Sequence, residues 1–241
     1  MSTWRGRRAR TEQARAYAGA RLPSLRTPWR NVSYCVVDLE LSGLDPRQSE
    51  ILSFGALPIE EGRIRLEATA FGLVRPTRPL AESSIRVHGI RAADLADAPE
   101  LAHALDPLLA AMTGRVLVAH HAAIERAFLS RALRQLGVRL RGPVLDSELL
   151  ARIWLAERDG ELPRRMTLAD LALACGLPVH SPHTATGDAL TTAQLFLAAV
   201  SKLDARRPET LRALSRAATR LADTEAHLPP RREAPAPSRE G

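Results

Sequence analysis

Residues 34–43 read Tyr-Cys-Val-Val-Asp-Leu-Glu-Leu-Ser-Gly, and this stretch decides the fold. The Val-containing first half, followed by a turn glycine, predicts a short buried strand over about 33–40. Because side chains alternate across a strand, Asp38 and Glu40 point to one face while Leu39 points to the other. Two such carboxylates repel each other and lose hydration, and a hard cation such as Mg²⁺ or Mn²⁺ offsets that cost. The alternative is a strand end that carries both charges into solvent.

The remaining pattern predicts an α/β fold. A second strand over 50–60, a hairpin turn at Glu61-Gly62 and a third strand over 63–74 form an antiparallel meander. Short buried strands follow at 116–119 and 144–145, which gives a mixed five-stranded sheet flanked by helices. Residues 84–90 read as a loop or short turn. The helical segments are expected at about 99–112, 122–136, 148–157, 167–176, 186–203 and 208–225.

The net charge of +7 lies mostly at the N-terminus. Residues 1–30 hold eight Arg and one Glu, whereas residues 31–226 hold 23 basic and 24 acidic residues. We expect a basic arm over 1–30, one folded domain over 31–205, a helix over 206–226 and a disordered Pro/Arg tail over 227–241. The arm either binds nucleic acid phosphates, keeps the protein in solution as a solvated tail, or is an organelle transit peptide.

Two compositional features bear on the compartment. The chain has no run approaching 18 apolar residues and no apolar segment at its start, so neither a membrane span nor a secretion signal is expected. Its two cysteines, Cys35 and Cys175, both lie among apolar residues. The composition predicts reduced core thiols in a cytoplasmic protein.

Further polar residues stand at positions suited to a metal site. Glu125 lies on the apolar stripe of the helix expected over 122–136, where a charged residue needs a partner. It is either paired with an Arg or a helix end, or it is a third acid of the site. His183 precedes Asp188 by five residues at the start of another helix. A site for phosphoryl transfer needs acids to hold ions and a base such as His to deprotonate water.

Three motifs follow one another along the chain: Asp38-x-Glu40, the segment 118–125 (Val-Ala-His-His-Ala-Ala-Ile-Glu) and His183-x-Ala-x-x-Asp188. They resemble the motifs of the DEDD-type 3′–5′ exonucleases, histidine-containing branch, the DnaQ-like group that includes the proofreading epsilon subunit of DNA polymerase III and RNase T. The likeness covers about 33–203. The resemblance implies a ribonuclease-H-like fold, two Mg²⁺ or Mn²⁺ ions, and release of nucleoside 5′-monophosphates from single-stranded DNA or RNA 3′ ends. DNA is the substrate we expect.

The resemblance also implies the roles of individual residues. Asp38, Glu40, Asp188 and Glu125 would hold the ions, with Asp38 touching both, and His183 would be the general base. The terminal nucleotide would be held by Leu41, Ser42, Gly43, His88 and His121, of which His88 lies in Val87-His88-Gly89-Ile90, a further segment similar to the family.

Three positions depart from the family pattern. Glu125 replaces the usual Asp, His121 a common Asn and Leu41 a common Thr. Charge is preserved at every acidic position, so we expect activity to survive. The rival interpretation is a non-catalytic nucleic-acid-binding module that has lost turnover through Glu125. A third is an accessory subunit whose arm or tail docks on a polymerase or another nucleic-acid enzyme.

Overall fold

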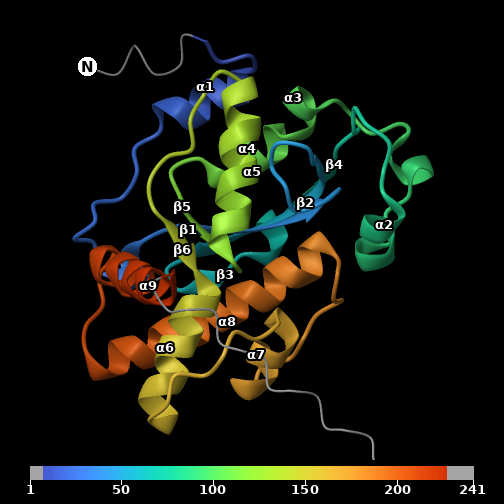
Figure 1. Cartoon of the computed structure of the whole chain (residues 1–241). Coiled ribbons are helices and arrows are strands. Elements are labelled where there is room, and N and C mark those ends of the chain that lie inside the picture. Colours follow the sequence, from blue (N-terminus) through green and yellow to red (C-terminus); the bar gives the residue numbers. More distant parts are fainter. Residues whose placement is uncertain (1–7, 227–241) are drawn as a thin grey trace, which may run out of the picture.

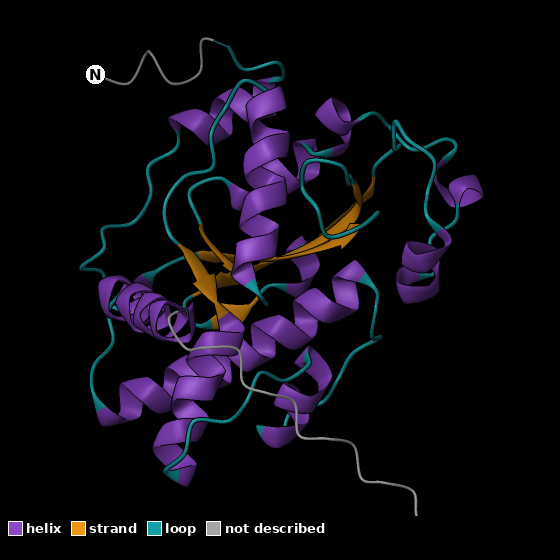
Figure 2. Cartoon of the chain, viewed as in Figure 1, coloured by secondary structure: helices purple, strands orange, loops and turns teal. Residues whose placement is uncertain are grey.

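A mixed β-sheet lies at the centre of the molecule, with helices packed on both of its faces (Figures 1 and 2). The structure is a computed structural model that describes residues 8–226. Within these residues the sheet has six strands in the order β3-β2-β1-β5-β6, and β4 also pairs with β2. The strands are β1 (Tyr34–Leu41), β2 (Ile51–Glu60), β3 (Arg63–Ile64), β4 (Ala70–Leu73), β5 (Val116–Ala119) and β6 (Val144–Asp146).

The predicted α/β class is confirmed. β1 and β2 are antiparallel, whereas β1, β5 and β6 run parallel. The strand number is six rather than five because the segment 63–74 is not continuous. Ile59 pairs with Ile64 and Ala56 with Ala70, so the residues between them have no room in the ladder. They form a 3₁₀ turn at Leu66–Ala68 beside Pro58, which lacks an N–H for strand pairing.

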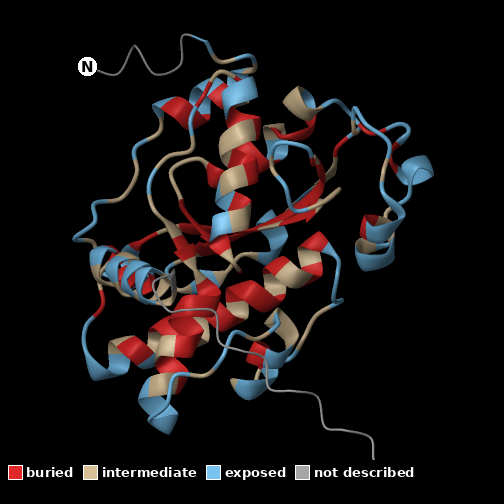
Figure 3. Ribbon diagram, viewed as in Figure 1, coloured by how far each residue is buried: buried red, intermediate tan, exposed pale blue. Residues whose placement is uncertain are grey.

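The alternation along β1 divides the core into two parts. Tyr34 and Val36 pack on one side against α6 (Ser147–Asp159), α8 (Ala185–Arg206) and α9 (Leu211–Ala226). Cys35 and Val37 pack on the other side against α1 (Glu12–Gly19), α4 (Asp106–Met112) and α5 (Ala122–Gln135). Figure 3 shows the sheet and the inward stripes of these helices as buried. The two thiols are free, with Cys35 buried and Cys175 half-buried.

Two helical predictions are corrected by the structure. Residues 84–90 lie largely within helix α2 (Glu82–His88), which ends at Gly89 in the left-handed conformation. The helix expected over 99–112 is two helices, α3 (Leu101–Ala104) and α4, because Pro107 near the start of α4 has no N–H to continue α3. The remaining helix, α7 (Leu168–Ala174), lies within the predicted segment 167–176.

Both ends of the described chain pack on the body. Ala14 and Tyr17 of α1 are buried, so this part of the predicted basic arm belongs to the core. Leu211 and Leu214 of α9 are buried as well. Residues 1–7 of the predicted arm and the predicted tail 227–241 lie outside the described residues. Between residues 8 and 226, no helix combines the length and hydropathy that a membrane span requires.

Candidate active site

Three carboxylates meet at the end of β1. Asp38 and Glu40 share their face of the strand with Val36, which is the side that α8 covers. Asp188 lies in the first turn of α8. One carboxylate oxygen from each of the three residues lies within 4.8 Å of the other two. The strand alternation inferred from sequence therefore brings the two β1 carboxylates onto the helix that carries the third.

Gly55 makes this meeting physically feasible. It pairs with Asp38 across β1 and β2. A Cβ atom at position 55 would lie 2.2 Å from the Ala185 carbonyl oxygen and 2.7 Å from the Thr186 nitrogen. Any side chain would therefore collide with the backbone at the start of α8. The absence of a side chain lets that helix approach the sheet beside Asp38.

The electrostatics of the three carboxylates suit a divalent cation. Burial, with repulsion from Glu125, Asp188 and Glu40, raises the pKa of Asp38 well above its usual value. Burial and repulsion from Asp188 likewise raise the pKa of Glu40. The pKa of Asp188 is raised by burial, although the His183 backbone opposes this. Hard oxygen donors that are buried together fit Mg²⁺ or Mn²⁺, whose charge would offset the repulsion.

Glu125 approaches this cluster from the opposite face of the sheet. It lies in the first turn of α5, whose Phe128 and Leu129 belong to the other half of the core. It is not one of the three clustered carboxylates, but its charge acts on Asp38. It is 7% exposed, and its Oε2 atom has no hydrogen-bond partner among the described residues. Burial raises the pKa of Glu125 to about 8, although a hydrogen bond to its own backbone opposes this rise. The helix-end contact that was the alternative to a site role is therefore present, whereas no Arg pairs with Oε2 among the described residues.

His183 lies on an exposed loop directly before α8. Its backbone is in the left-handed region with φ 61°, and its N–H donates to Asp188 Oδ2 at 3.0 Å. The charge of its imidazole partly opposes the rise in the pKa of both Asp188 and Glu40. The loop therefore places a base beside two of the three clustered carboxylates.

The predicted substrate-binding residues fall into two places. Ser42 Oγ accepts from the Glu50 N–H at 2.9 Å, which closes the turn after β1. Gly43 faces Ser49, whose Oγ would lie 2.6 Å from an added Cβ. His88 at the end of α2 lies beside Leu41, whose carbonyl acts on its ring, while burial keeps the pKa of His88 below its usual value. These four residues lie on one loop and the helix next to it, whereas His121 lies at the start of α5.

Sequence reasoning missed the polar residues behind His121. Its Nδ1 atom lies 3.2 Å from Glu148 Oε2, and Glu148 Oε1 lies 3.2 Å from Arg152 Nη1. Asp146 caps α6, and its Oδ2 also accepts from the Ala122 N–H at 2.8 Å and thus joins the starts of α5 and α6. The four-residue spacing of Glu148 and Arg152, which is typical of an ion pair on a helix, is the sequence pattern that could have identified these residues.

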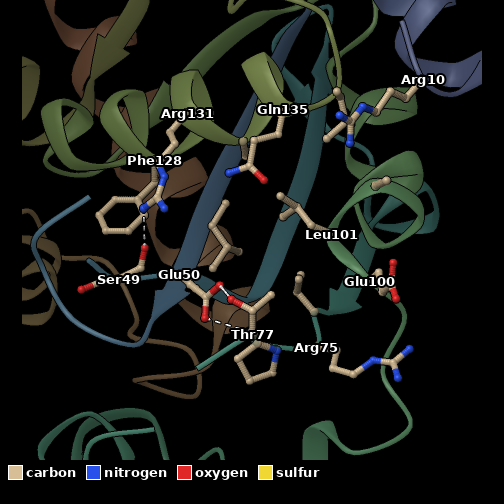
Figure 4. Close-up of a pocket in the computed structure, with 16 residues that line it drawn as sticks. Arg10, Ser49, Glu50, Arg75, Thr77, Glu100, Leu101, Phe128, Arg131 and Gln135 are labelled. Atoms are coloured by element: carbon tan, nitrogen blue, oxygen red, sulfur yellow. Dashed lines mark hydrogen bonds between the residues drawn. The ribbon is translucent and has the colours of Figure 1, made fainter. Parts of the chain in front are cut away.

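A cavity of about 340 Å³ lies along α5, and none of the predicted site residues lines it. Phe128 and Gln135 of α5 edge it, with Leu101 across from them (Figure 4). Glu50 closes one side by accepting from the Thr77 N–H at 3.0 Å and from its hydroxyl at 2.6 Å. The cavity is therefore separate from the carboxylate cluster.

Comparisons with known proteins match most of the chain to one family. The family model RNase_T, described as an exonuclease, matches residues 35–196. The DNA polymerase III subunit epsilon-like protein of Rhodobacter capsulatus is 35% identical over 182 residues, which cover 75% of this chain and 25% of that protein. The chain thus spans about a quarter of the length of this relative.

Two solved structures share the fold. Exonuclease X in complex with 5′ overhanging duplex DNA superposes with a TM-score of 0.59 at 22% identity, covering 77% of this chain and 99% of that one. Escherichia coli exonuclease I in complex with a dA16 oligonucleotide has a TM-score of 0.59 at 16% identity, covering 79% of this chain and 43% of that one.

Proposed function

The chain belongs to the exonuclease family whose model matches residues 35–196, and on that premise we propose that it is a divalent-metal-dependent 3′–5′ exonuclease. Its substrates are single-stranded ends, with DNA preferred to RNA, and its products are nucleoside 5′-monophosphates. The observation that carries this proposal is the meeting of Asp38, Glu40 and Asp188 within 4.8 Å. The DNA named with exonucleases X and I, and the polymerase named with the R. capsulatus relative, support the choice of DNA.

Each polar residue of the site has a proposed role. Asp38, Glu40 and Asp188 hold Mg²⁺ or Mn²⁺, and Glu125 faces a second ion. When bound, such ions would lower the pKa of a water molecule and stabilise the negative charge on the leaving oxygen. His183 accepts the proton of the attacking water, since it lies on a solvent-exposed loop beside two of the ligands.

The terminal nucleotide is held around the candidate cluster by two groups. The turn after β1 contributes Leu41, Ser42 and Gly43, and α2 contributes His88. The start of α5 contributes His121. A polymerase or other nucleic-acid enzyme is the proposed partner, supported by the name of the R. capsulatus relative.

The assay is degradation of 5′-labelled single-stranded DNA and RNA oligomers with Mg²⁺, Mn²⁺ or chelator. We expect a ladder that shortens from the 3′ end only with metal, and faster on DNA. Asp188→Asn keeps the shape but removes a ligand charge, so it should reduce the rate by at least about 10³-fold, in line with loss of a key electrostatic group. Asp159→Asn, at an exposed ion pair far along α6, is the matched control.

Three outcomes would contradict the proposal in whole or in part. Intact oligomers in every metal, with a shifted band on a native gel, would favour the non-catalytic binding module and make Glu125→Asp the first reversion to examine. A ladder that shortens from the 5′ end would overturn the direction but not the nuclease activity. Equal turnover by Asp188→Asn and the wild type would remove the assigned site.

A further inference from the structure

His121 has a backbone conformation that is uncommon for a residue other than glycine. It is the N-cap of α5 with φ 54° and ψ 50°, in the left-handed region, and its side chain makes no capping bond. Asn and His enter this region more readily than most non-glycine residues. Such a backbone needs support from the surrounding structure to persist.

A buried ion pair supplies that support. The side chain of Glu148 is 1% exposed and lies between His121 Nδ1 and Arg152 Nη1, at 3.2 Å from each. Burial would raise the pKa of Glu148, but the His121 hydrogen bond and the nearby charges of His121 and Arg152 bring it below its usual value. The carboxylate is thus ionised and holds the imidazole from behind.

The support continues to the C-terminal helix. Arg152 is 3% exposed, donates to the Pro163 carbonyl at 2.9 Å and lies 2.5 Å from Glu225 Oε1 on α9. Glu225 also pairs with the exposed Arg165 at 3.3 Å. An unbroken chain of charges therefore joins His121 to α9 through the interior of the molecule.

His121 lies at the same edge of the sheet as the candidate site, since it closely follows β5, which runs parallel to β1 with Val118 paired to Val36. The side chain is 37% exposed, and with Nδ1 engaged by Glu148 the Nε2 atom is the one left for a ligand. Asp146 couples His121 to Glu125 electrostatically. The charge of His121 acts to lower the pKa of Asp146, and the charge of Asp146 acts to raise the pKa of Glu125. His121 thus lies at the edge of the carboxylate cluster.

We propose that Glu148 is a positioning residue for His121, holding it so that Nε2 contacts the bound strand, and that Arg152 and Glu225 carry this support to α9. The inference rests on the proposed function. The competing explanation is that Glu148 only neutralises the buried Arg152. The two explanations differ in whether an effect of Glu148 depends on His121.

The test is a double-mutant comparison of steady-state kinetics on a single-stranded oligomer. Glu148→Gln should raise KM roughly three- to tenfold with kcat within about twofold, the pattern of lost substrate binding. The same change in a His121→Asn background should leave KM unaltered, because Asn holds the left-handed backbone without Glu148. Asp159→Asn, which removes an exposed charge from the same helix, should change neither constant.

Equal rises of KM in both backgrounds, or no rise in either, would overturn the proposal. If Glu148→Gln does not fold, Glu225→Gln loosens Arg152 from outside the site, and its smaller rise of KM should likewise vanish with His121→Asn. If the wild type shows no turnover in any metal, the proposed function fails. The positioning role is then read from the Kd of a fluorescent oligomer in Ca²⁺, with the same pattern expected and the same patterns overturning it.

Discussion

Glu125 is the residue whose surroundings depart most from those of an ordinary glutamate. It is buried at the start of α5, one carboxylate oxygen has no partner among the described residues, and it repels Asp38. Such a group is costly when it is ionised and unpaired. A cation would remove that cost, as would a proton, so a proton would compete with the second metal ion that we propose beside Glu125.

This competition predicts a pH dependence of stability in chelator. The folded pKa of Glu125, about 8, lies above its unfolded value, so the native state binds more protons between about pH 4.5 and 8. Its contribution is present below that range and is lost as the pH rises through about 8. We expect the free energy of unfolding to fall by on the order of a few kcal/mol across this range, Asp38 contributing in the same direction.

The side chain in Glu125→Gln cannot ionise, so the free energy of unfolding of this variant should decrease less with rising pH than that of the wild type. The measurement is the Tm by scanning calorimetry in EDTA from pH 5 to 8.5. Asp159→Asn, at an exposed position, is the control and should follow the wild-type curve. Parallel curves for the wild type and Glu125→Gln would show that Glu125 ionises in the fold at its ordinary pKa.

At the scale of elements, the contact of β2 with the start of α8 decides whether a site exists. β1 contributes two carboxylates by alternation, but the third arrives only because α8 lies against Gly55. Gly187, in the first turn of the same helix, is also tightly covered, since an added Cβ would lie 2.4 Å from the His180 and Ser181 carbonyl oxygens. The loop that carries His183 therefore packs directly on this turn.

Gly55→Ala should separate the carboxylates. The new methyl group overlaps backbone rather than a flexible side chain, so α8 has to move away from the sheet. We expect the exonuclease rate to drop roughly 10²-fold, as for a displacement of about 1 Å, and the stability to fall by about 1–3 kcal/mol. Gly19→Ala, with nothing within 4 Å, is the control and should be neutral in both assays. Wild-type activity in Gly55→Ala would mean that the contact does not position Asp188.

At the scale of the whole molecule, the segments before β1 and after α8 hold each other. The Trp29 N–H donates to the Glu209 carbonyl at 3.1 Å, and the Leu211 N–H donates to the Thr27 carbonyl at 3.1 Å. α9 then packs beside α6 in the core half that contains α8. Figure 1 shows α9 lying across the end of the sheet near β6. The body of the molecule thus extends beyond residues 31–205 on both sides.

Leu214→Ala tests whether α9 belongs to the same cooperative unit. Leu214 is fully buried, so the substitution should cost about 2–4 kcal/mol in the free energy of unfolding measured with urea. Leu173→Ala is the control, since Leu173 is 63% exposed and should change stability by less than about 0.5 kcal/mol. A loss no larger than in this control would show that α9 unfolds separately from the sheet.

The sequence by itself determined the strand β1, the shared face of Asp38 and Glu40, and the helices that begin at Ala122 and Ala185. These features follow from local periodicity and capping, which a few neighbouring residues encode. Only the tertiary structure decided the break of the third strand, the packing of α1 and α9, the orphaned oxygen of Glu125 and the chain of charges behind His121. Each of these depends on residues far apart in sequence, and on how closely two backbones can approach, which no local pattern records.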